Sequence, residues 1–409
     1  MVYSHDTFGL GNIRRMLAIC KHLLDAVPGL SVLLISGSPM LHSFRLPKGL
    51  DYIKLPCLGR SDRGELSAKY LGTETDEVLK LRSDLMLSAA TNFKPDLLLV
   101  DKKPYGLKGE LKSTLEYLTE EQPETQIVLL LRDILDSPEV TTHEWQEQGY
   151  YQAIASLYDQ VLVVGTPEIF DVRAEYHFPL SVARKVQFCG YIERELVDKG
   201  RETLRREWQV SPEEQLVLVT PGGGEDGYQL IDTYLKGLAQ LPSDRIPRSV
   251  IVCGPEMPPL QRCAFYQASS AYPQVQIEEF TDNLIGYMDA ADVVISMGGY
   301  NTVCEILSLG KRAIVIPRVH PVKEQWIRAE RMSKLGWFQA IHPDRLTPEL
   351  LMQHLQDQLQ ETVAEPLLSP ALNLNALPRI AQLLAPTFYR KFRSLGHGSF
   401  KFRCIIPTA

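Results

Sequence analysis

Short runs of apolar, often β-branched residues alternate with longer amphipathic stretches along the first half of the chain. Between residues 13 and 25, for example, apolar residues recur at intervals of three and four, the spacing of one helical face. The apolar runs have the length of strands and are Val2–Ser4, Val32–Ile35, Tyr52–Leu55, Leu97–Val100, Ile127–Leu131 and Val161–Val164. Strands that alternate with helices are typical of a parallel α/β sheet, so we predict one over this half.

A second series of the same kind follows a break near Tyr191. A charged stretch over residues 193–207 leads into it, and a last helical pattern covers Leu372–Tyr389. The apolar runs of the second series are Leu216–Thr220, Val250–Cys253, Val275–Ile277, Val293–Ser296 and Ala313–Ile316. A chain of 409 residues usually forms more than one domain. We therefore predict an α/β domain over residues 1–190, a second over 191–371, and a segment, 372–409, that crosses back onto the first.

The composition is that of a soluble globular protein and argues against several classes. Hydrophobic residues make up 44% and charged residues 23%, and no apolar run approaches the roughly 18 residues of a membrane helix. The net charge of −7 argues against nucleic acid as the main partner, because that partner normally requires a basic surface. The seven cysteines form neither Cys-x-x-Cys pairs nor clusters with histidine. We expect no disulfide framework, no zinc site and a cytoplasmic location.

Both ends of the sequence carry further signals. The first strand starts almost at Met1 with no signal peptide before it, which favours a start that clips this strand by a few residues. From Phe388 to Arg403, basic residues are interleaved with aromatic ones, without an acid. Such a tail could contact an anionic membrane from the cytoplasmic side. The alternative is the end of a packed helix followed by a basic tail.

A strand-to-helix turn with two glycines lies within residues 296–305. Gly298 and Gly299 follow an apolar run and precede a helical pattern, so the chain could approach an anion closely at a helix start. The unpaired N–H groups of a helix start and the positive end of its dipole attract phosphate. The turn therefore predicts a nucleotide-diphosphate pocket.

The helix after this turn has two predicted faces. Residues at helical spacing that are expected to face the core are Val303, Ile306, Leu307 and Gly310. Asn301 and Glu305, four apart, are left on the other face, where Glu305 could accept two hydrogen bonds from a ribose diol. The alternative is that Glu305 complements the helix dipole while Asn301 or Thr302 caps the helix.

Two further glycine-bearing loops follow predicted strands, at residues 5–12 and 221–227. Neither has the Gly-Lys-Ser/Thr ending of a nucleotide triphosphatase loop, and the first lacks the full dinucleotide pattern of three spaced glycines. Open α/β sheets bind ligands at the carboxyl ends of their strands. These loops and the Gly298 turn are therefore expected around one interdomain cleft, an arrangement that suits two substrates.

The order of features from Ser296 to Gly336 resembles that of a known family. A Gly-Gly-x-Asn-Thr-x-x-Glu turn is followed by a strand, Ala313–Pro317, and by the segment His320–Trp326. This order is similar to the donor site of GT-B glycosyltransferases, in particular of the enzymes that add N-acetylglucosamine to the lipid-linked precursor of peptidoglycan. The resemblance covers most of the chain. It implies two Rossmann-like domains facing across a cleft, a C-terminal helix crossing back, and a nucleotide-sugar donor, with a UDP-sugar favoured.

The resemblance also implies roles for individual residues on the donor side. Glu305 corresponds to the ribose ligand, and Glu324 with Gln325 to the pair that reaches hydroxyls of the donor sugar, which a carboxylate and an amide can bind together. The alternative is an ordinary polar helix start with Gln325 and Arg328 in solvent. The other implied donor residues are Gly222, Gly223, Gly224, Gly298, Gly299, Asn301, Thr302 and His320. The loop at 222–224 could also be a plain strand-to-helix turn.

On the acceptor side, this sequence departs from the family's pattern at one informative position. The loop that contains Gly9 and Gly11 carries Asn12 where relatives commonly have a histidine. An inverting transfer usually requires a general base for the acceptor hydroxyl, and an amide cannot serve as one. His5 and Asp6, at the end of the first predicted strand, are the best replacements, because a neutral histidine or a carboxylate can accept the proton.

Three more polar residues end predicted strands of the first domain. Asp101 and Asp133 are further candidates for the base, with the alternative that each only caps a loop. Arg132 offers a planar fork of donors that could hold acceptor hydroxyls or phosphate, and the alternative is an internal salt bridge.

Stereochemistry and metal use are inferred from two absences. Retaining GT-B enzymes typically carry a glutamate eight positions before the residue equivalent to Glu305, where this chain has Met297. The chain also lacks the Asp-x-Asp metal clamp of the other main glycosyltransferase fold. We therefore expect inverting transfer to an unknown acceptor without a metal or a cofactor. Two alternatives stay open: a sugar-nucleotide epimerase on the same fold, or a non-catalytic sugar-nucleotide-binding protein.

Overall fold

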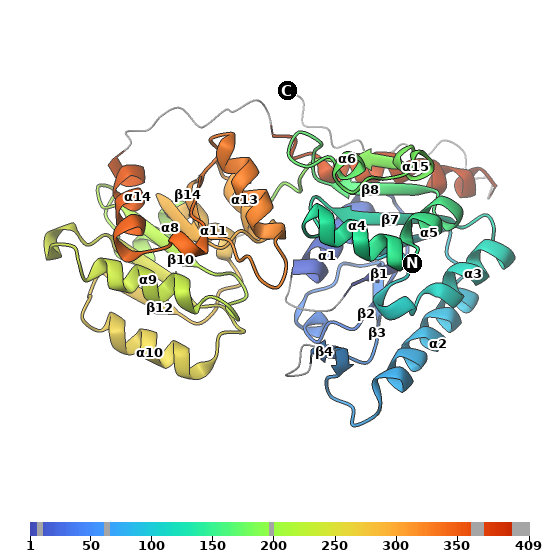
Figure 1. The fold of residues 1–409 in the computed structure, drawn as a ribbon, viewed down its shortest axis with the longest axis horizontal. Coiled ribbons are helices and arrows are strands. Elements are labelled where there is room, and N and C mark those ends of the chain that lie inside the picture. The colour runs from blue at the N-terminus through green and yellow to red at the C-terminus, as the bar shows by residue number, and fades with distance from the viewer. Residues whose placement is uncertain (6–10, 61–65, 196–199, 361–371, 395–409) are drawn as a thin grey trace. The chain divides into compact units, whose positions relative to one another are not determined.

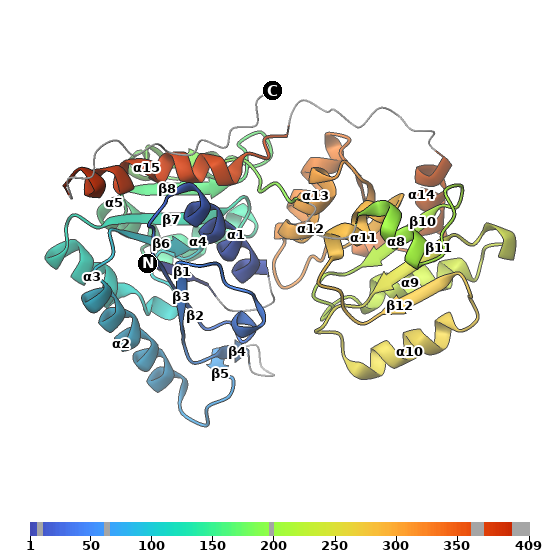
Figure 2. The same ribbon diagram turned by 180° about the vertical axis from the view of Figure 1, so that it is seen from behind.

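A computed structural model describes the chain except for residues 6–10, 61–65, 196–199, 361–371 and 395–409. The chain divides into two compact units (Figures 1 and 2). Unit 1 comprises residues 1–192 and 375–409, and unit 2 comprises residues 193–374. Each unit is built around its own parallel sheet, so each has its own hydrophobic core.

The sheet of unit 1 has seven parallel strands in the order β3-β2-β1-β6-β7-β8-β9. The strands are β1 (Val2–Ser4), β2 (Val32–Ser36), β3 (Leu50–Lys54), β6 (Leu97–Asp101), β7 (Gln126–Arg132), β8 (Gln160–Val164) and β9 (Val186–Phe188). The central strands are apolar and buried along most of their length, as expected where helices cover both faces of a parallel sheet. The strand order reverses between β1 and β6, and such a switch point is where open α/β sheets bind ligands.

The helices of unit 1 connect these strands and end with the last helix of the chain. They are α1 (Gly11–Ala26), α2 (Thr75–Phe93), α3 (Lys112–Glu121), α4 (Pro138–Glu147), α5 (Tyr150–Leu157), α6 (Val172–Glu175), α7 (Leu180–Ala183) and α15 (Ala376–Ser394), with 3₁₀ turns η1 (Leu41–Ser43) and η2 (Leu107–Gly109). Helix α15 packs against α1, so the prediction that the C-terminal helix returns to the first domain is confirmed.

The sheet of unit 2 has six parallel strands in the order β12-β11-β10-β13-β14-β15. They are β10 (Leu216–Thr220), β11 (Arg248–Val252), β12 (Val275–Glu278), β13 (Val293–Ser296), β14 (Arg312–Val315) and β15 (Gln339–Ala340). The helices are α8 (Arg201–Glu207), α9 (Tyr228–Leu238), α10 (Pro259–Ser269), α11 (Leu284–Ala290), α12 (Tyr300–Ser308), α13 (Glu324–Lys334) and α14 (Pro348–Gln360), with η3 (Ser243–Arg245) and η4 (Pro343–Arg345). The switch point of this sheet lies between β10 and β13.

The predicted parallel α/β class is confirmed, and the strands predicted from apolar runs are present with small shifts of their ends. The pattern missed the short edge strands β9 and β15 and the antiparallel hairpin of β4 (Leu58–Arg60) and β5 (Leu66–Ala68). These strands have two or three residues, and unlike β1 none of them forms an apolar run bounded by turn residues that the pattern could detect.

The last helix starts later than predicted, at Ala376 rather than Leu372. The residues before it pair with another segment: Asn375 forms an antiparallel bridge with Ile192, and Leu374 O accepts a hydrogen bond from Glu193 N at 3.2 Å. This extended pairing takes the backbone of these residues out of the helix.

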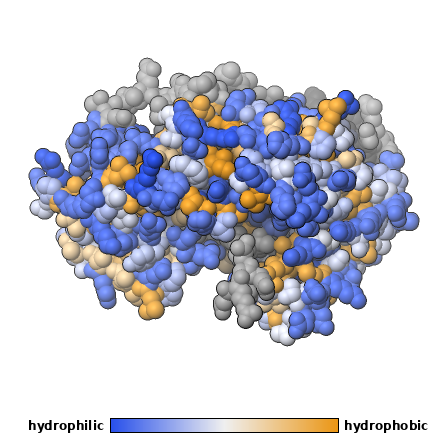
Figure 3. Space-filling model, in the orientation of Figure 1, coloured by the Kyte–Doolittle hydropathy of each residue, from blue (hydrophilic) through white to orange (hydrophobic). Residues whose placement is uncertain are grey.

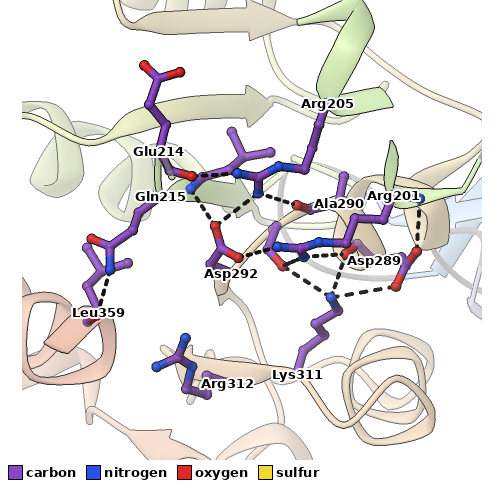
Figure 4. Close-up of polar contacts among 12 residues, drawn as sticks. Arg201, Arg205, Glu214, Gln215, Asp289, Ala290, Asp292, Lys311, Arg312 and Leu359 are labelled. Carbon is purple, nitrogen blue, oxygen red and sulfur yellow. Dashed lines mark hydrogen bonds and ion pairs between the residues drawn. The ribbon is translucent and has the colours of Figure 1, made fainter. Parts of the chain in front are cut away.

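An ion-pair network joins the amino ends of the unit 2 strands to α8 (Figure 4). Asp292, just before β13, accepts hydrogen bonds from Arg201 Nη2 at 2.5 Å, Arg205 Nη1 at 3.0 Å and Leu216 N at 2.8 Å. Burial alone would raise the pKa of Asp292, but these bonds outweigh it and lower the pKa. Lys311 Nζ donates to the carbonyls of Asp289 and Ala291 at the end of α11. The amino edge of this sheet is thus closed by internal contacts.

The surface is hydrophilic over most of the face in Figure 3, with apolar side chains visible at several separate places. Leu260 and Tyr266 of α10 are exposed. Among the described helices, none combines the length and the apolar composition that crossing a membrane requires.

Candidate functional site

The loops after β10 and β13 meet at the switch point of unit 2. Thr220 and Ser296 are partners in the parallel register, so the two loops leave the sheet side by side. Among the described residues, a Cβ added at Gly222 or at Gly299 would meet only Thr302 Oγ1 within 4 Å, at 3.9 and 3.8 Å. Both loops therefore border one open space next to the Thr302 hydroxyl.

The start of helix α12 faces this space without a side-chain cap. Its N-cap residue is Gly299, which has no side chain to accept from the first N–H groups. The alternative that Asn301 or Thr302 caps the helix is therefore wrong, because both lie inside its first turn. Uncapped N–H groups at the positive end of a helix dipole form a suitable anion site.

The remaining glycines of these loops are explained by packing within the chain. A Cβ at Gly224, whose φ is +99°, would lie 2.4 Å from Cys253 O, and one at Gly298 would lie 3.0 Å from Pro317 Cβ and 3.1 Å from Gln325 O. The distance at Gly224 is too short for any side chain, and those at Gly298 leave a side chain little room. Gly224 thus allows the loop to pack on the end of β11, and Gly298 allows α13 to approach the turn.

Asn301 and Glu305 are both buried, with 9% and 1% of their surfaces exposed. Helix α12 is covered on more than one side: six of its residues in the first two turns are buried, and it packs against α11. The prediction that only one face of this helix is directed toward the core is thus wrong in part. Cys304 is buried, while Gly310, which was predicted to face the core, lies beyond the helix and is exposed. The role of Glu305 as a ribose ligand stays a prediction.

Arg194 is a residue of this site that sequence reasoning missed. Its Nη2 donates to Asn301 Oδ1 at 2.8 Å, and its backbone N donates to Ser308 Oγ at 3.0 Å. A guanidinium is thereby held beside the first turn of α12, where it adds positive charge to the anion site. The only sequence signal was its place in the charged stretch after residue 193.

The start of α13 brings the predicted sugar-side residues next to the same turn. Glu324 Oε2 accepts from Arg328 Nη2 at 2.7 Å, and Gln325 Oε1 accepts from Arg318 N at 3.3 Å. Arg328 Nη1 donates to Gly298 O at 2.9 Å. Glu324, Gln325 and Arg328 are all buried, so the alternative of a solvated helix start is wrong. His320 lies exposed in the preceding loop.

In unit 1 a second polar cluster lies at the ends of β1 and β6. Arg15 Nη2 donates to Asp101 Oδ1 at 2.7 Å and to Asn12 Oδ1 at 3.2 Å, and His5 N donates to Asp101 Oδ2 at 3.3 Å. His5 Nδ1 is buried and has no hydrogen-bond partner among the described residues. Burial, reinforced by the nearby positive charges of Lys102 and Lys103, lowers the pKa of His5 well below its usual range. The ring is therefore neutral, but it is a weak proton acceptor.

Asp133 follows β7 and is held by two donors. Tyr191 Oη donates to Asp133 Oδ2 at 3.1 Å, and Ile134 N donates to Oδ1 at 2.8 Å. Arg132 is the last residue of β7, and Gly11 is the first of α1. Asp6 and Gly9 lie outside the described residues. The described residues contain no group of three or more His, Cys, Asp or Glu side chains placed to hold a metal ion.

Comparison with known sequences finds a family match over most of unit 2 and the start of α15. Residues 216–384 match the model of the glycosyltransferase family 28 C-terminal domain. Over 178 residues, 42% of this chain and 48% of the relative, the chain is 32% identical to the UDP-N-acetylglucosamine--N-acetylmuramyl-(pentapeptide) pyrophosphoryl-undecaprenol N-acetylglucosamine transferase of Haemophilus influenzae. An uncharacterized glycosyltransferase of Methanopyrus kandleri is 25% identical over 214 residues, 52% of this chain and 56% of that protein. The chain spans about half the length of the curated relatives it matches.

Solved structures resemble nearly the whole chain. MurG of Acinetobacter baumannii matches with a TM-score of 0.59 at 15% identity, covering 94% of this chain and 99% of that one. The kitacinnamycin glycosyltransferase matches with a TM-score of 0.63 at 16% identity, covering 94% and 98%. At these identities the likeness shows the fold. The chain has the GT-B fold of two Rossmann-like domains.

Proposed function

We propose that this protein is an inverting, metal-independent glycosyltransferase that moves a sugar from a nucleotide sugar to an acceptor. The observation that carries the proposal is the convergence of Gly222 and Gly299 on Thr302, at the uncapped start of α12. Open space beside the positive end of a helix dipole, at the switch point of a sheet, is suited to a diphosphate. The family 28 domain in the same unit supports the assignment.

The donor would be bound by groups from three segments of unit 2. The start of α12 and Arg194 would neutralise the diphosphate, Glu305 would accept from the ribose, and Glu324 with Gln325 would bind the sugar. As the leaving diphosphate gains charge, fixed N–H groups and a guanidinium stabilise it without having to reorganise. The named Haemophilus relative uses a UDP-sugar, which favours UDP as the nucleotide here.

The acceptor side rests on unit 1. Because of its place at the end of β1, His5 would take the acceptor proton, although its lowered pKa makes it a weak base, and Asp6 and Asp133 are the other candidates. Asn12, bound to Arg15, would position the acceptor rather than deprotonate it. The relative's name specifies a lipid-linked acceptor. A lipid-linked acceptor reached from the cytoplasmic membrane face is accordingly the first class to test.

The test is a screen of the purified protein by thermal shift and calorimetry against UDP-, GDP-, ADP-, CDP- and dTDP-sugars in EDTA. We expect one nucleotide sugar to stabilise the wild type but not Glu305→Ala. Binding of none of them would overturn the proposal. Analysis of the anomeric configuration of the product then tests inversion, because a retained configuration would contradict it.

A second candidate is a nucleotide-sugar-binding protein without transferase activity. The low pKa of His5 and the engagement of Asn12 by Arg15 favour it, since both weaken general-base catalysis. Tight nucleotide-sugar binding without turnover, on lipid-linked and soluble acceptors alike, would support this candidate over the first.

A further inference from the structure

One buried guanidinium connects the sugar side of the proposed donor site to its diphosphate side. Arg328, one turn into α13, donates from Nη2 to Glu324 Oε2 and from Nη1 to Gly298 O, at 2.7 and 2.9 Å. Its Cζ lies 5.6 Å from the ring centroid of Tyr300, the first residue of α12. The side chain is fully buried. A single group thus touches the starts of both helices and the turn between β13 and α12.

Stability alone does not account for a buried pair of this kind. Removing two charges from water costs about as much as their attraction returns, and well-packed apolar residues often stabilise a core equally well. The same helix has a matched pair at the same spacing, Glu330 with Lys334 at 3.0 Å, that is exposed to solvent. The pair at Glu324 and Arg328 differs in being buried against the glycine turn.

The bond to Gly298 O orients the peptide at the diphosphate turn. In a planar trans peptide the carbonyl oxygen and the following N–H point in opposite directions. Holding Gly298 O toward Arg328 therefore aims Gly299 N–H away from Arg328. A peptide between two glycines would otherwise rotate with little steric resistance. Arg328 thereby selects one of two orientations of this N–H group.

The hydrogen bond from Arg328 to Glu324 fixes the orientation of the Glu324 carboxylate. An ionised carboxylate only accepts hydrogen bonds, and the hydroxyls of a sugar can donate to it. A carboxylate that accepts a hydrogen bond from a buried guanidinium has a defined orientation, whereas a free glutamate samples several rotamers. The sugar would therefore meet a preorganised acceptor.

We propose that Arg328 is a positioning residue for donor recognition. It holds the Glu324 carboxylate and the Gly298–Gly299 peptide as one unit, so that recognition of the sugar is coupled to binding of the diphosphate. This inference rests on the proposed function. It predicts that Arg328 determines how strongly the protein prefers an intact nucleotide sugar over the nucleoside diphosphate alone.

The experiment measures the dissociation constants of UDP and UDP-N-acetylglucosamine, or of the corresponding pair that the screen selects, by calorimetry. Arg328→Lys keeps the charge but loses the fork, and we expect the preference for the nucleotide sugar to fall about tenfold or more, as for loss of one hydrogen bond to a charged group. Glu324→Gln should reduce the preference similarly while the constant for UDP stays within about twofold, because the bond to Gly298 O remains. Lys334→Gln, the exposed control, should match the wild type.

The outcomes separate this inference from the proposed function. A wild type that binds no nucleotide sugar refutes the proposed function itself. A wild type that binds, with the preference unchanged in a folded Arg328→Lys, overturns the positioning role even if this variant melts at lower temperature. If Arg328→Lys does not fold, an unchanged preference in Glu324→Gln still overturns the inference, because the carboxylate that Arg328 would position is then not used.

Discussion

The two sheets of this molecule place polar residues at equivalent strand ends, yet the two clusters differ. In unit 1, Asp101 lies between Arg15 and the backbone of His5, and the residues of this ion pair are almost fully buried. In unit 2, Gly222 and Gly299 border open space beside Thr302. Polar residues at strand ends therefore do not mark a ligand site by themselves. Space that the chain leaves unfilled is the better indicator.

The largest effect that this comparison predicts is in unit 1. Arg15→Ala removes the guanidinium that pairs with the buried Asp101 carboxylate, and we expect the free energy of unfolding to fall by about 3–5 kcal/mol. Urea unfolding measures it. The control Arg173→Ala breaks a partly exposed pair with Asp171 and should cost no more than about 1 kcal/mol. If Arg15→Ala and Arg173→Ala lower the free energy of unfolding by similar amounts, the pair of Arg15 and Asp101 is not part of the packed core.

The glycines of unit 2 give the next effect. Gly224→Ala forces a Cβ against Cys253 O at a φ of +99° and should destabilise the fold by more than about 2 kcal/mol. At Gly299, φ is −62° and, among the described residues beyond its chain neighbours, no backbone atom lies within 4 Å of an added Cβ. Gly299→Ala should therefore change stability by less than about 1 kcal/mol. Its methyl group would instead enter the open space and weaken nucleotide binding. Thermal unfolding and calorimetry together measure both effects, and equal destabilisation by the two changes would remove the distinction.

Arg194→Gln tests whether the open end is an anion site. The variant removes the positive charge beside α12, and we expect nucleoside diphosphate binding to weaken by about 1.5–3 kcal/mol, the usual value for a hydrogen bond to a charged group. Calorimetry at two salt concentrations measures it. Arg206→Gln, an exposed change on α8, is the control. Unchanged affinity in Arg194→Gln would place the phosphates elsewhere.

The smallest effect is a pH dependence of unit 1. The pKa of His5 is lowered by burial and by Lys102 and Lys103, so below about pH 6.5 the unfolded chain binds a proton that the folded one does not. The contribution of His5 to stability is complete above that pH and is lost as the pH falls, by up to about 1.4 kcal/mol per pH unit. Urea unfolding at several pH values should show a shallower slope in His5→Gln. A slope in His5→Gln as steep as that of the wild type would contradict the prediction.

The fold could be predicted from the sequence further than the site. Strands β1, β10 and β13 have the bounds that their apolar runs indicated. A parallel strand that is buried on both faces is apolar along its whole length, so the apolar run has the same length as the strand. The sequence could not tell glycines that serve packing from glycines that border a ligand site. Only the structure shows that Gly224 packs on Cys253 while Gly222 borders open space. Arg194 was missed because its partner Asn301 is 107 residues away.

The pairing where the chain passes between the units has a consequence for exchange of domains. Glu193 N donates to Leu374 O, and the next residues outward, Ile192 and Asn375, form a bridge. The first and last residues of unit 2 are therefore neighbours, and unit 2 is an insertion in unit 1 with adjacent ends. A domain with adjacent ends can be replaced without stretching its host. Residues 193–374 are thus a cassette that a chimera could exchange with that of a relative, to ask which half of the chain carries each substrate preference.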